Sequence, residues 1–150
     1  MHRVLVLNGP NLDVLGQRRS ELYGTQTLAE IETRLRERAL QWPDVQLEFY
    51  QANGEGELID WLHRHMGSAE ALIVNAGGLT HTSVSLRDAI EALAVPTVEV
   101  HLSNIHGREE FRQRSLLAPL CLGSICGLGG FGYEAALEAL ARRAELPRRT

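Results

Sequence analysis

The segment ALIVNAGGLTH, residues 71–81, contains the pattern that decides the fold: a continuous apolar strand, Ala71 to Val74, followed at once by small and polar residues. A second apolar strand, Arg3 to Leu7, precedes Asn8-Gly9-Pro10-Asn11. Three more strands are predicted at residues 45–50, 97–100 and 120–125, and helical periodicity fills the intervals between them. Strands that alternate with helices in this way favour a parallel sheet covered on both faces.

Capping signals and apolar stripes predict the helices. Thr27 and Glu30 form a capping box that opens a helix running to about Gln41. Three further helices carry stripes at Leu58, Ile59, Leu62 and Met66; at Leu86, Ala89, Ile90 and Leu93; and at Tyr133, Ala136, Leu137 and Leu140. A charged turn or short helix is expected at residues 108–114. The favoured fold is therefore α/β: a flavodoxin-like three-layer sandwich with a five-stranded parallel sheet in the order 2-1-3-4-5, in one domain spanning residues 1–150.

The charged residues exclude several chemistries. The chain has 150 residues, with 15 Lys+Arg against 19 Asp+Glu, and all of the cations are arginine. Without lysine there is no Schiff base, no anchor for pyridoxal phosphate and no Walker-type phosphate ligand. A formal charge of -4 and 5% aromatic residues argue against nucleic acid as a partner.

The termini and the cysteines indicate an ordinary cytoplasmic protein. The apolar run at residues 4–7 is too short for a signal peptide or a membrane span. Cys121 and Cys126 are expected on opposite faces of the last strand, as small core residues and not as a disulfide or a metal pair. Residues 146–150 are expected to form a frayed tail.

Polar residues follow three of the predicted strands where those strands end. In such a sheet, ligands bind beyond the carboxyl ends, at the switch between the first and third strands. The segments in question are Asn8 to Asn11, Asn75 to His81 and Glu99 to Asn104. Asparagine and glycine also suit tight turns, so any one of these loops taken alone is as easily structural.

Glu99 and His101 are two residues apart on a strand and therefore share a face. A carboxylate beside an imidazole orients it and raises its basicity, which makes His101 a candidate general acid or base. The alternative is a polar pair facing solvent on an edge strand. Function is favoured, because this strand should be internal and a buried polar pair there needs a reason.

The loop from Leu15 to Gly24 joins the first strand to the first long helix and has the length of an active-site lid. A guanidinium from Arg18 or Arg19 would favour the tyrosinate form of Tyr23 and turn it into a base. A solvated basic loop whose tyrosine covers the core weighs slightly more on these residues alone.

Four other features have plain structural interpretations. Arg112 is a candidate carboxylate or hydroxyl anchor, although an exposed, salt-bridged helix is the more general expectation for residues 108–112. Asp88 lies on a helix away from the strand ends. The glycines of GLGGFG, residues 127–132, match a dinucleotide fingerprint, but only 18 residues follow, so close packing at a turn is expected instead. His63 and His65 point to different sides of a helix, which argues against a metal site.

Several long segments resemble the type II 3-dehydroquinate dehydratase family, the lysine-independent form of dehydroquinase. The matching segments cover nearly the whole chain: LVLNGPNLDVLG (5–16), RRSELYG (18–24), GELIDWLH (56–63), VNAGGLTHTSVSLRDA (74–89), VEVHLSNIHGREEFR (98–112) and GLGGFGYEAAL (127–137). The resemblance implies a reversible anti elimination of water from 3-dehydroquinate to 3-dehydroshikimate through an enolate, with no metal and no cofactor.

The resemblance also implies a role for each matching residue. Tyr23 would be the base, Arg18 would hold it as tyrosinate, and His101, oriented by Glu99, would be the general acid. The remaining residues would position a water or bind the substrate: Asn11 for the water, Asn75, Leu102 and Ser103 for the carboxylate, and His81 and Arg112 for the ring hydroxyls. Asp88 would reach a neighbouring subunit's site in trimers that assemble into a homododecamer.

Three departures from the family pattern and one alternative function remain. Arg19-Ser20 replaces the family's usual Glu-Pro in the lid, and Asp13 stands where Asn or Gly is common. Gln113-Arg114-Ser115-Leu116 departs from the usual sequence after Arg112. The alternative function is a flavodoxin-like module that binds a flavin or a nucleotide without catalysis.

Overall fold

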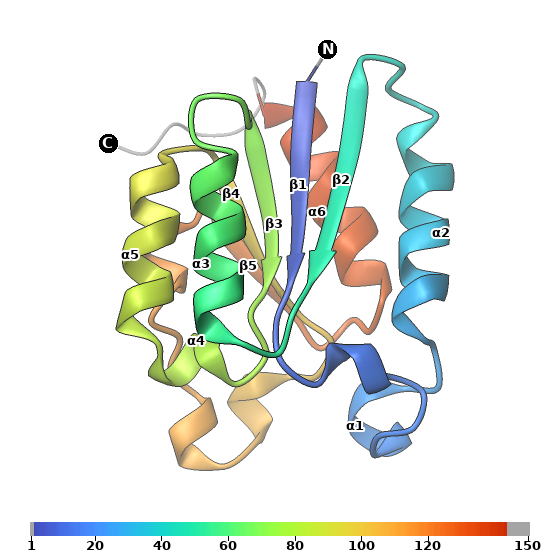
Figure 1. Ribbon diagram of the computed structural model, residues 1–150. Helices are drawn as coiled ribbons and strands as arrows, with labels where there is room; N and C mark the ends of the chain where they lie inside the picture. Colours follow the sequence, from blue (N-terminus) through green and yellow to red (C-terminus); the bar gives the residue numbers. More distant parts are fainter. Residues whose placement is uncertain (1, 144–150) are drawn as a thin grey trace.

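Five parallel strands form the centre of the computed structural model, which describes residues 2–143. The strands are β1 (His2–Asn8), β2 (Val45–Gln51), β3 (Ala71–Asn75), β4 (Thr97–His101) and β5 (Gly123–Cys126). Their order is β2-β1-β3-β4-β5, which confirms the predicted sheet (Figure 1).

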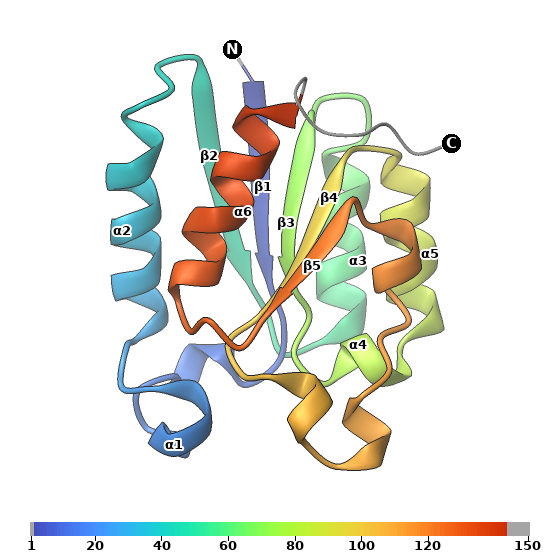
Figure 2. The same cartoon turned by 180° about the vertical axis from the view of Figure 1, so that it is seen from behind.

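Helices cover both faces of the sheet and make three layers. On one face lie α3 (Glu55–Arg64) and α5 (Val84–Leu93); on the other lie α2 (Leu28–Ala39) and α6 (Phe131–Ala141), as Figures 1 and 2 show from opposite sides. Each helical layer buries its own apolar cluster against the sheet, because β1 and β3 carry apolar side chains on both faces. β4 is apolar on one face only, with Val98 and Val100, and carries Thr97, Glu99 and His101 on the other.

The predicted capping box and most of the predicted stripes are present. Thr27 Oγ1 accepts a hydrogen bond from the Glu30 amide, and the Glu30 carboxylate accepts one from the Thr27 amide. The predicted apolar positions of α5 and of α6 are all buried. Met66 is the exception: α3 ends at Arg64, and Met66 is 50% exposed.

The last strand begins later than the sequence indicates. Residues 118–120 form the 3₁₀ turn η4 (Ala118–Leu120), and β5 starts only at Gly123. Pro119 favours this turn, because its ring restricts the backbone and it has no amide hydrogen for a sheet ladder. Cys121 is therefore a buried residue ahead of the strand, and the prediction that both cysteines lie on one strand is wrong.

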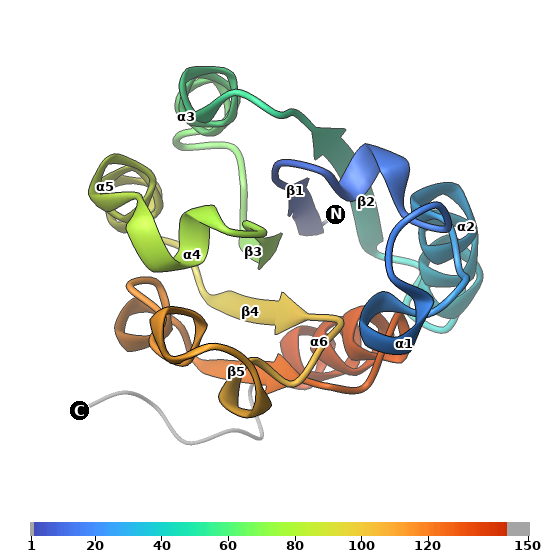
Figure 3. The same cartoon turned by 90° about the horizontal axis from the view of Figure 1, so that it is seen from below.

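The carboxyl ends of the strands meet at one edge of the sheet, the edge viewed in Figure 3. Strand register places Asn8 beside Asn75, and Gly9 and Gly77 let the loops after β1 and β3 touch. A Cβ on Gly9 would collide with the Ala76 backbone, and Gly77 has a φ of +58° with the Pro10 carbonyl close by. Short elements complete this edge: η1 (Leu12–Val14), α1 (Ser20–Tyr23), α4 (Leu79–Thr82), η2 (Ile105–Gly107) and η3 (Glu110–Arg112).

Two predictions concern the chain ends and membranes. The tail predicted at residues 146–150 lies outside the described part of the chain. Among residues 2–143, no helix has both the length and the apolar character needed to cross a bilayer.

Candidate active site

A pocket of about 210 Å³ opens at the carboxyl end of the sheet. Its wall includes every site residue expected from the sequence except Glu99 and Asp88. The polar lining consists of Asn11, Arg18, Tyr23, Asn75, His81, His101, Ser103, Arg108 and Arg112, and the rest is Pro10, Leu12, Gly77, Gly78, Leu102 and Ile105. The residues come from the loops after β1, β3 and β4, together with α1 and α4, so the fold brings the predicted segments to one place.

Glu99 lies directly behind His101, with no exposed surface of its own. The His101 Nε2 atom lies 3.2 Å from Glu99 Oε2, in ion-pair contact without the alignment of a linear hydrogen bond. Both residues are on β4, which confirms that they share a face of an internal strand. Because Nε2 faces the carboxylate, Nδ1 is the ring nitrogen left for the pocket.

Three hydroxyl groups also donate to the Glu99 carboxylate. Oε2 accepts from Thr80 Oγ1 at 2.8 Å and from Ser115 Oγ at 2.6 Å, and Oε1 accepts from Ser124 Oγ at 3.0 Å. Burial raises the pKa of Glu99, but the contacts with His101, Ser115 and Thr80 outweigh it and hold the pKa of this carboxyl below its ordinary value. Glu99 is therefore a buried, charged partner for His101.

Tyr23 contacts two arginines. Arg108 Nη1 donates a hydrogen bond to the Tyr23 hydroxyl at 2.9 Å, and the Arg18 guanidinium lies over the phenol ring, 4.0 Å from its centroid. The Arg108 side chain is only 11% exposed. The sequence-based interpretation of Arg108 as a solvated surface residue is therefore wrong, and Arg108 is a residue of the pocket. Arg19, by contrast, pairs with Glu21 at 2.8 Å on the surface.

His81 and Arg112 lie at the α4 and η3 side of the pocket. His81 Nδ1 is 2.8 Å from the Arg114 carbonyl, which can only accept, so Nδ1 carries a proton. In the neutral imidazole, Nε2 is then a hydrogen-bond acceptor. The His81 and His101 rings are nearly parallel, with centroids 6.4 Å apart. Arg112 Nε is held by Glu109 Oε2 at 2.9 Å.

Asn11 is held in a left-handed conformation at the end of the loop after β1. Its φ is 70°, and its amide donates to Asn53 Oδ1 at 2.9 Å. Asn53 also accepts from Gln51 and donates to Asp13, both within 3.2 Å. The pattern of strand ends predicts Asn11 as a site residue, whereas Gln51 and Asn53 come from the end of β2 and had no sequence signal.

Asp88 is the predicted site residue that lies apart from the pocket. It is an exposed residue of α5, on the helical layer beside the pocket. Its expected contact with the site of a neighbouring subunit stays a prediction.

The glycine run at residues 127–132 forms the turn from β5 into α6. A Cβ on Gly132 would lie 3.1 Å from Val100 and 3.4 Å from Ile125, so this glycine lets α6 approach the sheet closely. This agrees with the expectation of close packing.

The His63-x-His65 motif places its two side chains in different surroundings, as expected. His63 is exposed, whereas His65 is buried between Glu48 and the Trp61 carbonyl. Within residues 2–143 no three His, Cys, Asp or Glu side chains gather at metal-binding distance.

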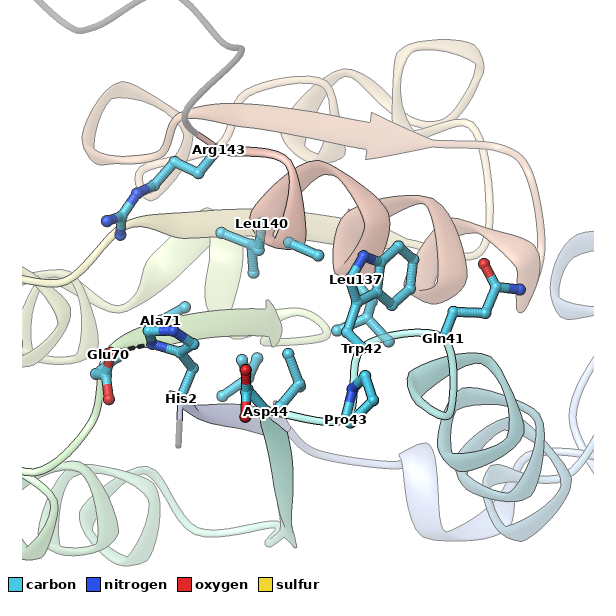
Figure 4. Close-up of a pocket in the computed structure, with 13 residues that line it drawn as sticks. His2, Gln41, Trp42, Pro43, Asp44, Glu70, Ala71, Leu137, Leu140 and Arg143 are labelled. Carbon is cyan, nitrogen blue, oxygen red and sulfur yellow. Dashed lines mark hydrogen bonds and ion pairs between the residues drawn. The ribbon is translucent and has the colours of Figure 1, made fainter.

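A second hollow, of about 390 Å³, lies at the opposite, amino-terminal end of the sheet (Figure 4). Trp42, Leu137 and Leu140 form its apolar wall, and His2 and Glu70 pair at its rim. None of the expected site residues lines it.

Known proteins resemble this chain along nearly its whole length. The family model described as dehydroquinase class II matches residues 2–141. The chain is 54% identical to the 3-dehydroquinate dehydratase of Synechococcus sp. over 92% of this chain and 93% of that protein. It is 51% identical to the 3-dehydroquinate dehydratase of Dinoroseobacter shibae, over 93% of this chain and 92% of that protein. The crystal structure of type II dehydroquinase from Propionibacterium acnes matches with a TM-score of 0.89 and 37% identity, covering 95% of this chain and 97% of that chain. This chain belongs to the class II dehydroquinase family.

Proposed function

We propose that the protein is a type II 3-dehydroquinate dehydratase, a carbon–oxygen lyase that removes water from 3-dehydroquinate to form 3-dehydroshikimate. The observation that carries this proposal is the placement of two groups in one 210 Å³ pocket: Tyr23, bonded to the Arg108 guanidinium, and His101, backed by buried Glu99. An elimination through an enolate needs a base, an acid and charge stabilisation, and these groups can supply all three.

Tyr23 is the proposed base. As the phenolate, it removes the proton next to the substrate ketone, and the electron pair of that bond moves into the enolate. Arg108 donates to the Tyr23 oxygen and Arg18 lies over its ring, so both cations stabilise the negative charge that a phenolate carries. The role that the resemblance assigns to Arg18 is thus divided between two arginines.

His101 is the proposed general acid. It gives a proton to the departing hydroxyl group, which leaves as water while the enolate collapses to the conjugated enone. The Glu99 carboxylate stabilises the positive imidazolium before the transfer, and three hydroxyls hold that carboxylate in place. The buried charge of Glu99 therefore serves the chemistry of its neighbour.

The rest of the lining is proposed to hold the substrate. The backbone N–H groups of Leu102 and Ser103, with the Asn75 side chain, face the substrate carboxylate, and Asn11 positions a water beside the enolate. His81 Nε2 accepts from a ring hydroxyl, because its Nδ1 proton is engaged by Arg114, and Arg112 donates to a ring hydroxyl. The absence of lysine from the chain excludes the imine route to the same product.

The assembly, location and pathway belong to the same proposal. We propose trimers that form a homododecamer, in which Asp88 reaches a neighbouring subunit's pocket from the exposed side of α5. A cytoplasmic location and a role in the shikimate pathway are likewise expected. Sedimentation velocity on the purified protein tests the assembly, and a monomer at working concentration would contradict it.

The direct test of the activity is spectroscopic. Incubation with 3-dehydroquinate should raise the absorbance of the conjugated enone product, and Tyr23→Phe should lower kcat by at least about 100-fold. If the wild-type protein produces no enone, or if it is purified with a bound flavin, the dehydratase proposal fails. Wild-type turnover by a folded Tyr23→Phe variant would contradict the base assignment alone.

A further inference from the structure

A fully buried tyrosine, Tyr133, lies beneath the pocket in the first turn of α6. It does not line the pocket. Its hydroxyl accepts a hydrogen bond from Asn75 Nδ2 at 2.9 Å and donates one to Asn8 Oδ1 at 2.6 Å. Tyr133 thus joins a residue of the pocket wall to the end of β1, across 125 positions of sequence.

The direction of these hydrogen bonds follows from one backbone group. The Gly77 amide can only donate, and it donates to Asn75 Oδ1 at 3.2 Å. Asn75 must therefore present its NH₂ group to Tyr133, and the tyrosine proton must point to Asn8. Burial raises the pKa of Tyr133, so the phenol keeps the proton that this chain of hydrogen bonds requires.

The arrangement has a consequence for the pocket. Asn75 uses its oxygen for Gly77 and one of its two N–H groups for Tyr133. The second N–H group is left for a ligand, so Asn75 can act toward a ligand as a hydrogen-bond donor. An anionic oxygen, such as a carboxylate oxygen, is the partner that this donor suits.

We propose that Tyr133 is a positioning residue that fixes the Asn75 amide as a hydrogen-bond donor to the substrate carboxylate. The inference rests on the proposed function for the identity of the substrate, but the link between Tyr133 and Asn75 stands on geometry alone. Without the tyrosine hydroxyl, the Asn75 amide loses one of the two contacts that define its orientation.

The glycine run at residues 127–132 helps to place Tyr133. Gly132 directly precedes Tyr133, and its missing side chain lets α6 lie against Val100 and Ile125. That close approach brings the Tyr133 hydroxyl within reach of the ends of β1 and β3. The glycine pattern that resembles a dinucleotide fingerprint therefore allows the packing that places Tyr133 against Asn75.

Steady-state kinetics test the proposal. Tyr133→Phe removes only the hydroxyl oxygen and should raise KM for 3-dehydroquinate about ten-fold while kcat changes less. The reason is that the variant weakens the hydrogen bond from Asn75 to the substrate carboxylate, which is present in the ground state and the transition state alike. Asn75→Ala should raise KM by at least as much. In the Asn75→Ala background, Tyr133→Phe should raise KM no further, because its effect passes through Asn75.

A matched control separates positioning from stability. Thr97→Val also removes a buried hydroxyl, one that bonds the Val95 carbonyl away from the pocket. It should lower Tm and leave both KM and kcat at wild-type values. An unchanged KM in Tyr133→Phe would overturn the proposal, as would a further rise in KM when Tyr133→Phe is added to Asn75→Ala.

A second measurement does not depend on turnover. The chain has five asparagines, so selective ¹⁵N-asparagine labelling resolves the Asn75 side-chain amide. One Asn75 N–H should exchange slowly with solvent in the wild type and rapidly in Tyr133→Phe. If the wild type fails to dehydrate 3-dehydroquinate but shows this difference, the proposed function fails and the positioning link stands; equal exchange in both proteins would overturn the link.

Discussion

The two ends of the sheet carry the same kind of ion pair in opposite surroundings. At the amino end, the His2 and Glu70 side chains are 65% and 47% exposed, at the rim of a hollow of about 390 Å³. At the carboxyl end, the His101 and Glu99 side chains are 6% and 0% exposed, at a pocket of about 210 Å³. Burying a charged pair is unfavourable unless other groups satisfy it, and here three hydroxyls do so. The candidate active site is therefore distinguished from the hollow at the amino end by a buried carboxylate whose hydrogen bonds are satisfied. Volume does not distinguish them in this way, because the hollow at the amino end is the larger of the two.

The largest difference between the two ends should appear in turnover. His101→Ala removes the proposed acid and should lower kcat by about 10²–10⁴-fold, whereas His2→Ala should leave kcat unchanged. The enone assay measures both. A comparable loss of kcat in both variants would show that the burial of the His101–Glu99 pair does not mark the active site.

The arginines provide the next comparison. Arg108→Met removes the cation bonded to Tyr23 and should lower kcat by roughly 10–100-fold. Arg143→Met, at the hollow of the amino end, should have no effect on kcat. Circular dichroism confirms that each variant is folded. Equal kcat values for the wild type and Arg108→Met would remove Arg108 from the proposed mechanism.

Glu99 and Glu70 should differ in how strongly they make the free energy of unfolding depend on pH. The folded pKa of Glu99 is below its ordinary value of 4.5, so its stabilisation is fully present above pH 4.5 and is lost as the pH falls through the folded value. Glu99→Gln should therefore cost about 2 kcal/mol at pH 7, with a difference that shrinks below pH 4.5.

Glu70→Gln is the control for this effect. The pKa of Glu70 is also lowered, first by its hydrogen bond with His2, but the pair is exposed and is screened by salt. Urea unfolding at pH 7, 5 and 3.5 compares the variants. A loss that does not depend on pH in Glu99→Gln would mean that packing, not charge, is what this residue contributes.

The smallest effect should come from the packing beneath the site. A Cβ at Gly132 would lie 3.1 Å from Val100, so Gly132→Ala should displace α6 slightly, cost about 1 kcal/mol and raise KM two- to three-fold. Gly56→Ala, in α3 with open space around it, should instead stabilise the fold slightly. Thermal melts and the enone assay measure both, and no change in KM for Gly132→Ala would indicate that α6 adjusts without disturbing Asn75.

Local patterns predicted much of the fold and most of the pocket lining. The apolar strands, the capping box at Thr27 and the stripes of α5 and α6 depend on nearby residues, so the sequence reveals them. The same holds for Asn11, Asn75 and His101, because the ends of parallel strands meet at one edge. The start of β5 was predicted too early, because Pro119 and a 3₁₀ turn interrupt an otherwise apolar run.

Arg108 shows what a local pattern misses. In sequence it stands among Glu109, Glu110 and Arg112, a composition typical of an exposed turn. Its burial depends on Tyr23, 85 positions away, whose hydroxyl it reaches across the pocket. No periodicity or motif in the chain signals a contact of that span.

The sequence by itself determined the order of strands and helices, the chemical types at the strand ends and, through the absence of lysine, the exclusion of an imine route. The tertiary structure alone decided which groups satisfy Glu99, which arginine bonds Tyr23, and that Tyr133 holds Asn75. The physical reason is the range of the interactions. Propensity and periodicity act over a few residues, whereas the orientation of a buried polar group depends on partners that only folding brings within 3 Å of it.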